Sequence, residues 1–402
     1  MNRFALLVLL AATPAVAGLA ACTTTVETTT LAAAGDGGST HGEVDLTADA
    51  GTSADAAPDA SRPPVPALPV IPNQGGPVIA APEIVSITWQ GDSLASGLEA
   101  FDAWMVKSAF WKDMMAEWGV GPGTYVGAFH VPTAAPATLD DADIQKLLTD
   151  GFAAGKIPRP NGSRIYTVYP PAGTTVTNFG TEGCSGFQAY HYSLSVPASA
   201  AGPAATALYA VAPRCADTQG QTPLDFVTWG QSHEVMETAS DPIYSSPAWR
   251  IDVQSLATPQ QGENADLCTG HPTRVDGFTV TRNWSNVAAK AGARPCVPAP
   301  PGPMFGVYAE PGEVTISAGK TTTVKVRAYA TGALAPFAVS AFTSDPSLKA
   351  SLDTKKAADG DELTLTLTPS ANWVEVEGQN LVYLFAQVDS YNTKRHLILH
   401  AK

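Results

Sequence analysis

The sequence predicts an α+β domain followed by an all-β sandwich. Three observations lead to this prediction. Apolar residues recur with helical and strand periods over 83–297, four prolines crowd 298–303, and short alternating segments fill 305–402. The chain of 402 residues is long enough for two such domains, and 45% of it is apolar. Most of the chain can therefore bury a core.

The charge and the hydropathy of the chain argue against two broad classes of function. Its 23 Lys and Arg residues against 37 Asp and Glu residues give a net charge of −14, whereas a nucleic-acid binder needs a basic face. After the first segment, no stretch approaches the roughly 20 consecutive apolar residues of a membrane-spanning helix. We therefore expect no nucleic-acid partner and no transmembrane helix in the mature chain.

Residues 1–22 have the layout of a bacterial export signal. Arg3 provides a positive start, an apolar run follows, and small residues lead to Cys22. The ending LAAC at 19–22 resembles the lipobox of bacterial lipoproteins, in which the signal is cut before the Cys and lipid is attached to it. An ordinary cleaved signal with a chance Cys is the alternative. We expect an exported protein that a lipid on Cys22 anchors in the bacterial cell envelope.

Residues 23–82 are predicted to form a disordered tether. They are mostly Thr, Ala, Gly, Asp and Pro, with Arg62 as their single basic residue and no aromatic residue. Such a composition buries too little apolar surface to offset the entropy lost on ordering. Thr23 and Thr24 lack the Asp of an inner-membrane retention signal, so we expect the outer membrane or the cell surface as the location.

The α+β part, residues 83–297, shows mixed periodicities from its start. Gly119 and the glycines after it end the first helical pattern, and Thr138 is the expected cap of the second. The predicted elements are a strand at 84–89, a helix at about 94–118, a helix from Thr138, a strand at 164–169, a loop carrying 190–192, a strand at 207–212 and a helix at 224–239.

About seven short β-like segments follow the proline-rich boundary. Within 324–328 and within 363–368, every second residue is apolar, as expected for strands with one buried face. Seven short strands in about 100 residues are typical of an immunoglobulin-like sandwich. We therefore predict such a sandwich over 305–402, with a supporting or adhesive role.

Cysteine usage agrees with export. Besides Cys22, the chain has four cysteines, which predict two disulfides and allow three pairings. We favour the pairs that are neighbours in sequence, which are Cys184–Cys215 and Cys268–Cys296.

The helix at 224–239 carries the motif HExxE. His233 and Glu237 lie one turn apart on the same face, so both can bind one Zn²⁺ ion, and Glu234 beside them can take a proton from a water molecule. This is the arrangement of the zincin motif HExxH with Glu in place of the second His. The motif therefore predicts a zincin-like α+β domain that acts as a zinc-dependent, metallopeptidase-like hydrolase on a protein or polysaccharide substrate.

A third zinc ligand has to come from elsewhere in the chain. Glu263, about 26 residues beyond Glu237, is our first choice, with Asp266 orienting it or His233. His191 is the competing candidate, as a ligand or as a catalytic residue that stabilises the transition state. In the simplest alternative, His233 and Glu237 are only a polar pair on a helix surface.

The string SHEVMETASDP at 232–242 resembles the SHExxExxTDP signature of the EXORDIUM-like (phosphate-induced protein) family of secreted proteins and its bacterial relatives. Three further segments resemble family elements in the same order, namely 186–191, 262–268 and 283–286. The resemblance covers roughly residues 84–296. Ser240 departs from it, because the family usually has Thr there, and so does Ala189, where Gly is common.

The resemblance implies an extracellular protein. It also implies metal binding by His233, by Glu237 and by one of Glu263 or Asp266, with Glu234 as the base. The alternative function is a non-catalytic surface module that binds protein or polysaccharide with a structural metal ion or with none. Six tryptophans would offer aromatic surface for such binding; they are Trp89, Trp104, Trp111, Trp118, Trp229 and Trp249. Core packing is the alternative for each of them, and helical spacing favours it for Trp104 and Trp111.

Overall fold

The computed structural model describes residues 68–402 except 216–220, 252–261, 344, 377–379 and 390. The predicted export signal, Cys22 and the predicted tether up to residue 67 lie outside the described residues. Within them, no helix is both long and apolar enough to cross a membrane.

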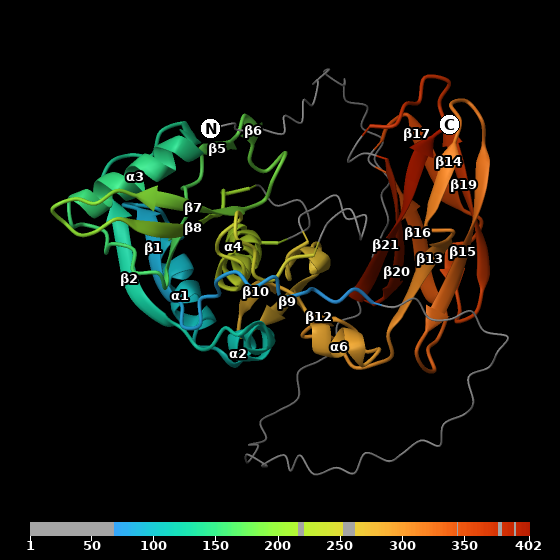
Figure 1. Ribbon diagram of the computed structural model, residues 1–402, viewed down its shortest axis with the longest axis horizontal. Coiled ribbons are helices and arrows are strands. Elements are labelled where there is room, and N and C mark those ends of the chain that lie inside the picture. Colours follow the sequence, from blue (N-terminus) through green and yellow to red (C-terminus); the bar gives the residue numbers. More distant parts are fainter. Residues whose placement is uncertain (1–67, 216–220, 252–261, 344, 377–379, 390) are drawn as a thin grey trace, which may run out of the picture. The chain divides into compact units, whose positions relative to one another are not determined.

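A five-stranded sheet organises the first part of the described chain (Figure 1). Four of its strands are parallel, and the edge strand β7 runs antiparallel to its neighbour β8. Strand β1 has the sequence EIVSITW and is almost entirely buried, as expected for an inner strand of a parallel sheet. In spatial order the strands are β2 (Thr124–Val131), β1 (Glu83–Trp89), β4 (Arg164–Val168), β8 (Ala205–Val211) and β7 (Tyr190–Val196).

The helices before the site differ from the prediction in two ways. The single helix expected at 94–118 is wrong, because the Ser108 hydroxyl accepts the N–H of Trp111 and starts a new helix. The expected cap Thr138 is also wrong, since Asp140 caps the next helix and Asp143 completes the capping box. The helices are α1 (Ala95–Met105), α2 (Ala109–Met115), the 3₁₀ turn η1 (Ala116–Trp118) and α3 (Asp141–Ala153).

Helix α4 (Pro223–Ser240) crosses the middle of this part, as predicted. Thr222 caps it by accepting the N–H of Asp225, Pro223 occupies its first turn, and Asp241 ends it before Pro242. Val235, Met236 and Ala239 are buried in the core. Most of its polar residues are also buried, so they need partners inside the protein.

A set of small elements surrounds the end of α4. The predicted disulfides are both confirmed, since Cys184 bonds to Cys215 and Cys268 to Cys296. The elements are β3 (Thr138–Asp140), β5 (Thr175–Asn178), β6 (Thr181–Glu182), η2 (Asp266–Cys268), β9 (Pro272–Val275), β10 (Phe278–Thr281), β11 (Asn283–Trp284), α6 (Asn286–Lys290) and β12 (Cys296–Val297).

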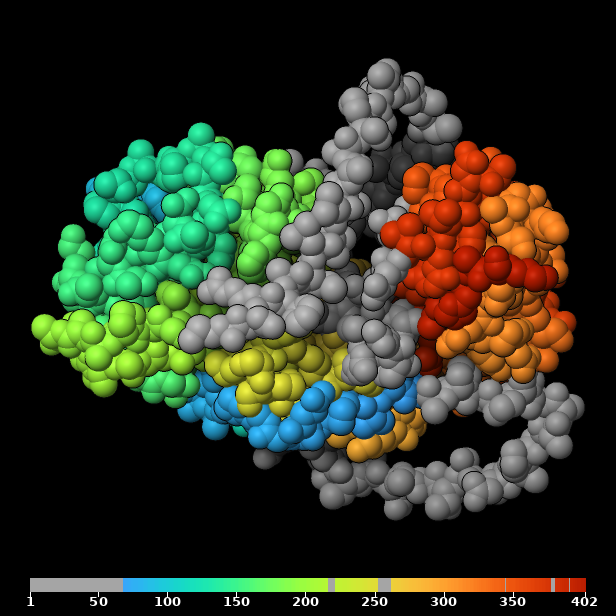
Figure 2. All heavy atoms as spheres, turned by 45° about the horizontal axis from the view of Figure 1, so that its top comes forward, coloured from blue at the N-terminus to red at the C-terminus, as the bar shows by residue number. Residues whose placement is uncertain are grey.

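Residues 68–82 are packed, although the sequence placed them in the tether. Ile71 and Ile79 are buried. Asn286 accepts the backbone N–H of Ile71 and donates to its carbonyl, each at 2.9 Å, and the N–H of Ile79 donates to the carbonyl of Ala239. In Figure 2 this blue segment runs beside the yellow residues that follow α4. Isolated apolar residues between prolines thus pack on a surface that hydrophobic periodicity in the sequence does not reveal.

The C-terminal part is all-β, as predicted. It contains two sheets, with the orders β13-β15-β19-β17 and β14-β21-β20-β16-β18. Leu363, Leu365 and Leu367 point into the core while the residues between them are more exposed. The strands are β13 (Phe305–Glu310), β14 (Glu313–Ile316), β15 (Thr322–Ala330), β16 (Phe337–Phe342), β17 (Leu348–Leu352), β18 (Lys356–Ala357), β19 (Glu362–Pro369), β20 (Leu381–Val388) and β21 (Tyr391–Ala401).

The six tryptophans named from the sequence pack mostly in the core, as helical spacing favours for Trp104 and Trp111. Four of them, Trp89, Trp111, Trp118 and Trp229, are at most 8% exposed, and the other two are partly buried. Trp118 packs edge-on against Trp249. These residues stabilise the core, because their large apolar area gains most when it leaves water.

Candidate metal centre

The titratable residues selected from the sequence line one cavity of about 480 Å³. Its lining residues come from helix α4, from strand β7 with residues 186–189 before it, and from residues around η2. The residues that the structure brings together here are His191, His233, Glu234, Glu237, Glu263 and Asp266.

His233 belongs to one group of potential ligands. Its Nε2 lies 3.2 Å from Oε1 of Glu237 and 3.4 Å from Oδ1 of Asp266. The ligand atoms of these three residues all lie within 4.8 Å of one another, as binding to one cation requires. Asp266, rather than the first-choice Glu263, is therefore the carboxylate that joins His233 and Glu237.

His191 belongs to a second group. Its Nδ1 lies 3.0 Å from Oε2 of Glu234 and 3.8 Å from Oε2 of Glu237, and its Nε2 lies 3.9 Å from Oε1 of Glu263. His191, Glu237 and Glu263 also have ligand atoms within 4.8 Å of one another. Glu263, which the sequence placed beside His233, is thus found beside His191.

The position of His191 corrects the sequence interpretation, which put residues 190–192 in a loop. They begin β7, and Ala210 of β8 pairs with His191. Tyr190 points into the core and hydrogen-bonds to Asp141 at 2.8 Å. The alternation of Tyr190 inward and His191 toward the cavity is a strand signal, but three residues are too few to reveal it.

Arg250 is a positive side chain that contacts this cluster. Its Nη2 lies 2.6 Å from Oε1 of Glu263 and 3.0 Å from Oδ2 of Asp241, and its guanidinium stacks over the ring of Tyr244. Asp241 also accepts the backbone N–H of Ala248 at 2.7 Å. Because Arg250 and both carboxylates are largely buried, the pairing fixes Glu263 at the cavity wall.

Burial and mutual charge perturb the proton affinities of the cluster strongly. Burial lowers the pKa of His191, but Glu263, Glu234 and Glu237 outweigh it and raise that pKa to about 9. The pKa of His233 is raised well above its usual value in the same way, with burial opposed by Glu237 and Asp266. Burial and the Asp266 carboxylate raise the pKa of Glu237 to about 8. The raised pKa values mean that these groups bind protons tightly. A cation that binds to them must therefore displace those protons.

Aromatic side chains surround the polar floor. Phe187, Tyr192, Trp229 and Tyr244 line the cavity. Tyr244 is 67% exposed, and its ring lies at the mouth beside Arg250. The cavity therefore combines apolar ring surface with carboxylates and imidazoles.

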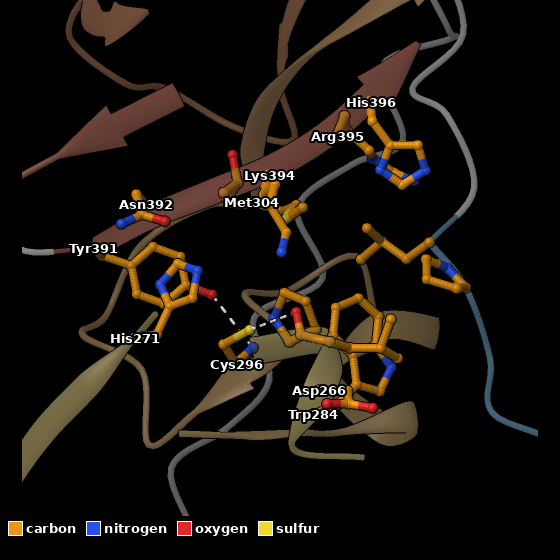
Figure 3. Close-up of a pocket in the computed structure, with 15 residues that line it drawn as sticks. Asp266, His271, Trp284, Cys296, Met304, Tyr391, Asn392, Lys394, Arg395 and His396 are labelled. Carbon is orange, nitrogen blue, oxygen red and sulfur yellow. Dashed lines mark hydrogen bonds between the residues drawn. The ribbon is translucent and has the colours of Figure 1, made fainter. Parts of the chain in front are cut away.

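Asp266 also borders a second, smaller cavity of about 130 Å³ (Figure 3). Lys394 of β21 extends into this cavity, and His271 lines it. Burial lowers the pKa of Lys394, although the Asp266 carboxylate opposes this, and burial together with Lys394 lowers the pKa of His271 to about 3. The C-terminal part thus places a cationic side chain near a residue of the candidate metal centre.

No protein-family model matches the chain, and no curated protein matches it. Among solved structures, domains 4 and 5 of the S-layer protein SbsC match with 14% identity and a TM-score of 0.19, over 25% of this chain and 54% of that one. A chimeric titin Z1Z2 tandem matches with 18% identity and a TM-score of 0.17, over 25% and 49%.

A protein of unknown function from Porphyromonas gingivalis W83 matches with 15% identity and a TM-score of 0.19, over 36% of this chain and 59% of that one. This chain thus spans about half to three fifths of the length of these three structures. Likenesses of this size determine neither the fold nor the function of the chain.

Proposed function

We propose that the chain is a cell-envelope lipoprotein whose α+β domain is a zinc-dependent, metallopeptidase-like hydrolase. This proposal rests on one observation. Two imidazoles and four carboxylates line the same cavity. Imidazole nitrogens and carboxylate oxygens are the ligands of catalytic zinc sites. Their separations in the His233 group, 3.2 and 3.4 Å, fit ligands around a tetrahedral ion with bonds of about 2.0–2.2 Å.

His233, Glu237 and Asp266 would hold the ion. A bound zinc ion lowers the pKa of a water molecule and polarises the carbonyl that the water attacks. Glu234, on the same helix and at the cavity, would accept the proton of the attacking water. His191 would position Glu234, because its ring nitrogen lies 3.0 Å from the Glu234 carboxylate.

An extended polypeptide is the substrate that best fits the cavity wall. Among the described residues, β7 pairs only with β8, so the other edge of β7 keeps its backbone donors and acceptors for a further strand. Residues 190–193 of this strand line the cavity. A peptide that adds to the edge would pass over α4, where Glu234 lies.

The arrangement of the family-like segments supports the proposed membership of the EXORDIUM-like family. Residues 186–191 lead into β7, 232–242 form the end of α4, and 262–268 contain Glu263 and η2. Segments that are far apart in sequence thus meet at one cavity. We also infer that the C-terminal part is an immunoglobulin-like support that carries no chemistry of its own.

One observation favours the second candidate function, a non-catalytic binding module. Glu263 is paired with Arg250 at 2.6 Å and His191 with Glu234 at 3.0 Å, so parts of the cluster satisfy each other without an ion. In that case the aromatic rim would bind a peptide or a glycan without cleaving it.

Metal analysis combined with a cleavage assay separates the two candidates. The full chain is purified in detergent, its zinc content is measured, and a mixture of unstructured polypeptides is offered as substrate. We expect cleavage by the parent and a loss of about 10²- to 10⁴-fold in kcat/KM for Glu234→Gln at unchanged zinc content. Bound zinc without cleavage by the parent would favour the binding module, and a folded parent that takes up no zinc would refute the hydrolase.

A further inference from the structure

We propose that the cavity holds two divalent cations, with Glu237 as the ligand that they share. The first cation is bound by His233 and Asp266, and the second by His191 and Glu263. This inference rests on the proposed function for the first cation. It adds a metal site and assigns His191 and Glu263 to it.

The two oxygens of Glu237 face different imidazoles. Oε1 lies 3.2 Å from Nε2 of His233, and Oε2 lies 3.8 Å from Nδ1 of His191. The backbone N–H of Asp266 donates to Oε1 at 2.9 Å, and the side chain is buried, so its orientation is fixed. Among the described residues, Glu237 is also the member common to both groups whose ligand atoms lie within 4.8 Å of one another, as a carboxylate shared by two cations must be.

Each imidazole has a carboxylate of its own besides Glu237. Oδ1 of Asp266 lies 3.4 Å from the ring of His233, and Oε1 of Glu263 lies 3.9 Å from the ring of His191. Ligands around a tetrahedral ion with bonds of about 2.0–2.2 Å are roughly 3.4 Å apart. The separations of the ligand atoms in both groups are close to this value.

One cation does not use both histidines in this arrangement. Among the described residues, the groups with mutually close ligand atoms contain either His191 or His233, and Glu237 is their common member. A single cation beside His233 therefore leaves a second complete set of one imidazole and two carboxylates. Paired cations about 3.5–4 Å apart are a known arrangement in hydrolytic sites.

The charge of the cavity also favours more than one cation. Four carboxylates line it, those of Glu234, Glu237, Glu263 and Asp266, and Arg250 contacts one of them. With neutral imidazoles, three negative charges remain, which exceeds what one divalent cation carries. One divalent cation therefore leaves one of these negative charges unbalanced.

Glu234 has a defined part in this arrangement. Its Oε2 accepts a hydrogen bond from Nδ1 of His191 at 3.0 Å, which leaves Nε2 as the nitrogen for the second cation. A carboxylate on the far nitrogen fixes the ring orientation of a metal-binding histidine. His191 is thus a ligand in this proposal, and Glu234 remains the proton acceptor.

The test is the number of cations bound per chain. The full chain is purified in detergent through a tag without histidine and is loaded with Mn²⁺, whose electron paramagnetic resonance spectrum reports coupling between neighbouring ions. We expect two equivalents and a coupled spectrum for the parent. His191→Ala and His233→Ala should each retain one equivalent and lose the coupling.

Two further variants keep the test decisive. Glu263→Gln, which is close in size to the natural residue, replaces His191→Ala if the latter fails to fold as judged by circular dichroism. His130→Ala serves as the matched control, since His130 lies on β2 outside both groups, and it should retain two equivalents.

The outcomes distinguish this proposal from the one on which it rests. One equivalent in the parent, lost in His233→Ala and kept in His191→Ala, overturns the second cation and leaves the proposed hydrolase standing. Two equivalents that persist in both His191→Ala and Glu263→Gln place the second ion elsewhere and also overturn the proposal. A folded parent without any bound metal overturns both.

Discussion

The backbone N–H of Asp266 donates a hydrogen bond to Oε1 of Glu237 at a distance of 2.9 Å. The two residues are 29 positions apart in the chain. The carboxylate of Asp266 meanwhile lies 3.4 Å from His233. Asp266 therefore orients Glu237 through its backbone N–H and offers a ligand atom through its carboxylate. The backbone contact does not depend on the side chain.

This separation allows a substitution that tests the ligand alone. Asp266→Asn removes the negative charge and leaves the backbone hydrogen bond to Glu237 in place. We expect zinc affinity to fall by at least about 10-fold, the lower end of the loss seen when metal-site partners are removed. Competition with a chromophoric chelator measures this. An unchanged affinity would exclude Asp266 as a ligand.

Metal binding should stabilise the folded chain by mass action. At a free zinc concentration about 100 times Kd, the parent should gain roughly 2.7 kcal/mol in its free energy of unfolding. His233→Ala should gain much less, because it lacks the imidazole of the first group. Thermal unfolding with and without zinc, and again after a chelator, checks the expectation. Equal stabilisation of parent and variant would mean that zinc binds elsewhere.

Arg250 should be needed for stability even without metal. It is paired with Asp241 and Glu263, whose side chains are 0% and 2% exposed. Arg250→Met leaves both carboxylates buried without a cation, and breaking a buried pair in this way costs about 3–5 kcal/mol. Urea unfolding of the metal-free chain measures the loss.

A second substitution tests the origin of that loss. Adding Glu263→Gln to Arg250→Met removes one of the two uncompensated charges, so part of the stability should return. If the double variant is no more stable than Arg250→Met, the loss comes from packing of the arginine stem rather than from charge.

Asp102 should also make the stability of the folded chain depend on pH. It is fully buried on α1 and accepts hydrogen bonds from Ser86, Thr167 and Tyr169 at 2.5, 2.6 and 2.7 Å. Burial nevertheless raises its pKa from 3.8 to about 6. The folded chain therefore binds this proton more tightly than the unfolded chain does.

The sign of the effect follows from this difference. Stability from Asp102 falls as the pH rises from about 4 to about 6 and is constant above, with a total loss on the order of 3 kcal/mol. Asp102→Asn should flatten the stability profile in this window, as measured by urea unfolding at several pH values. Asp113→Asn, at an exposed position, is the control and should keep the slope. A parent profile without a fall in this window would contradict the expectation.

Local patterns in the sequence predicted the elements that local interactions stabilise. Helix α4 shows this best. Thr222 and Pro223 start it, Pro242 follows its end, and the spacing of His233 and Glu237 follows from the helical repeat alone. The alternating leucines of β19 likewise identify a strand, because every second residue is buried.

The interruption between α1 and α2 could not be read from the same kind of pattern. The apolar spacing continues through Ser108, and what breaks the helix is a side-chain hydrogen bond to the N–H of Trp111. The packing of residues 68–82 has no local sequence signal for a related reason. Ile71 and Ile79 are isolated in a polar, proline-rich stretch, and their partners lie on α4 and α6, far along the chain.

The sequence by itself determined that His233, Glu234 and Glu237 share one helix, because their spacing matches the helical repeat. It favoured the pairing of neighbouring cysteines without excluding the other two pairings. Only the tertiary structure decided how the carboxylates are divided. It placed Asp266 with His233 and Glu263 with His191, and it joined His191 to Glu234 across 43 residues. These contacts arise when β7 pairs with β8 and η2 packs at the end of α4. Hydrophobic periodicity in the sequence does not reveal such contacts, because they depend on which segments that are distant in sequence pack against one another.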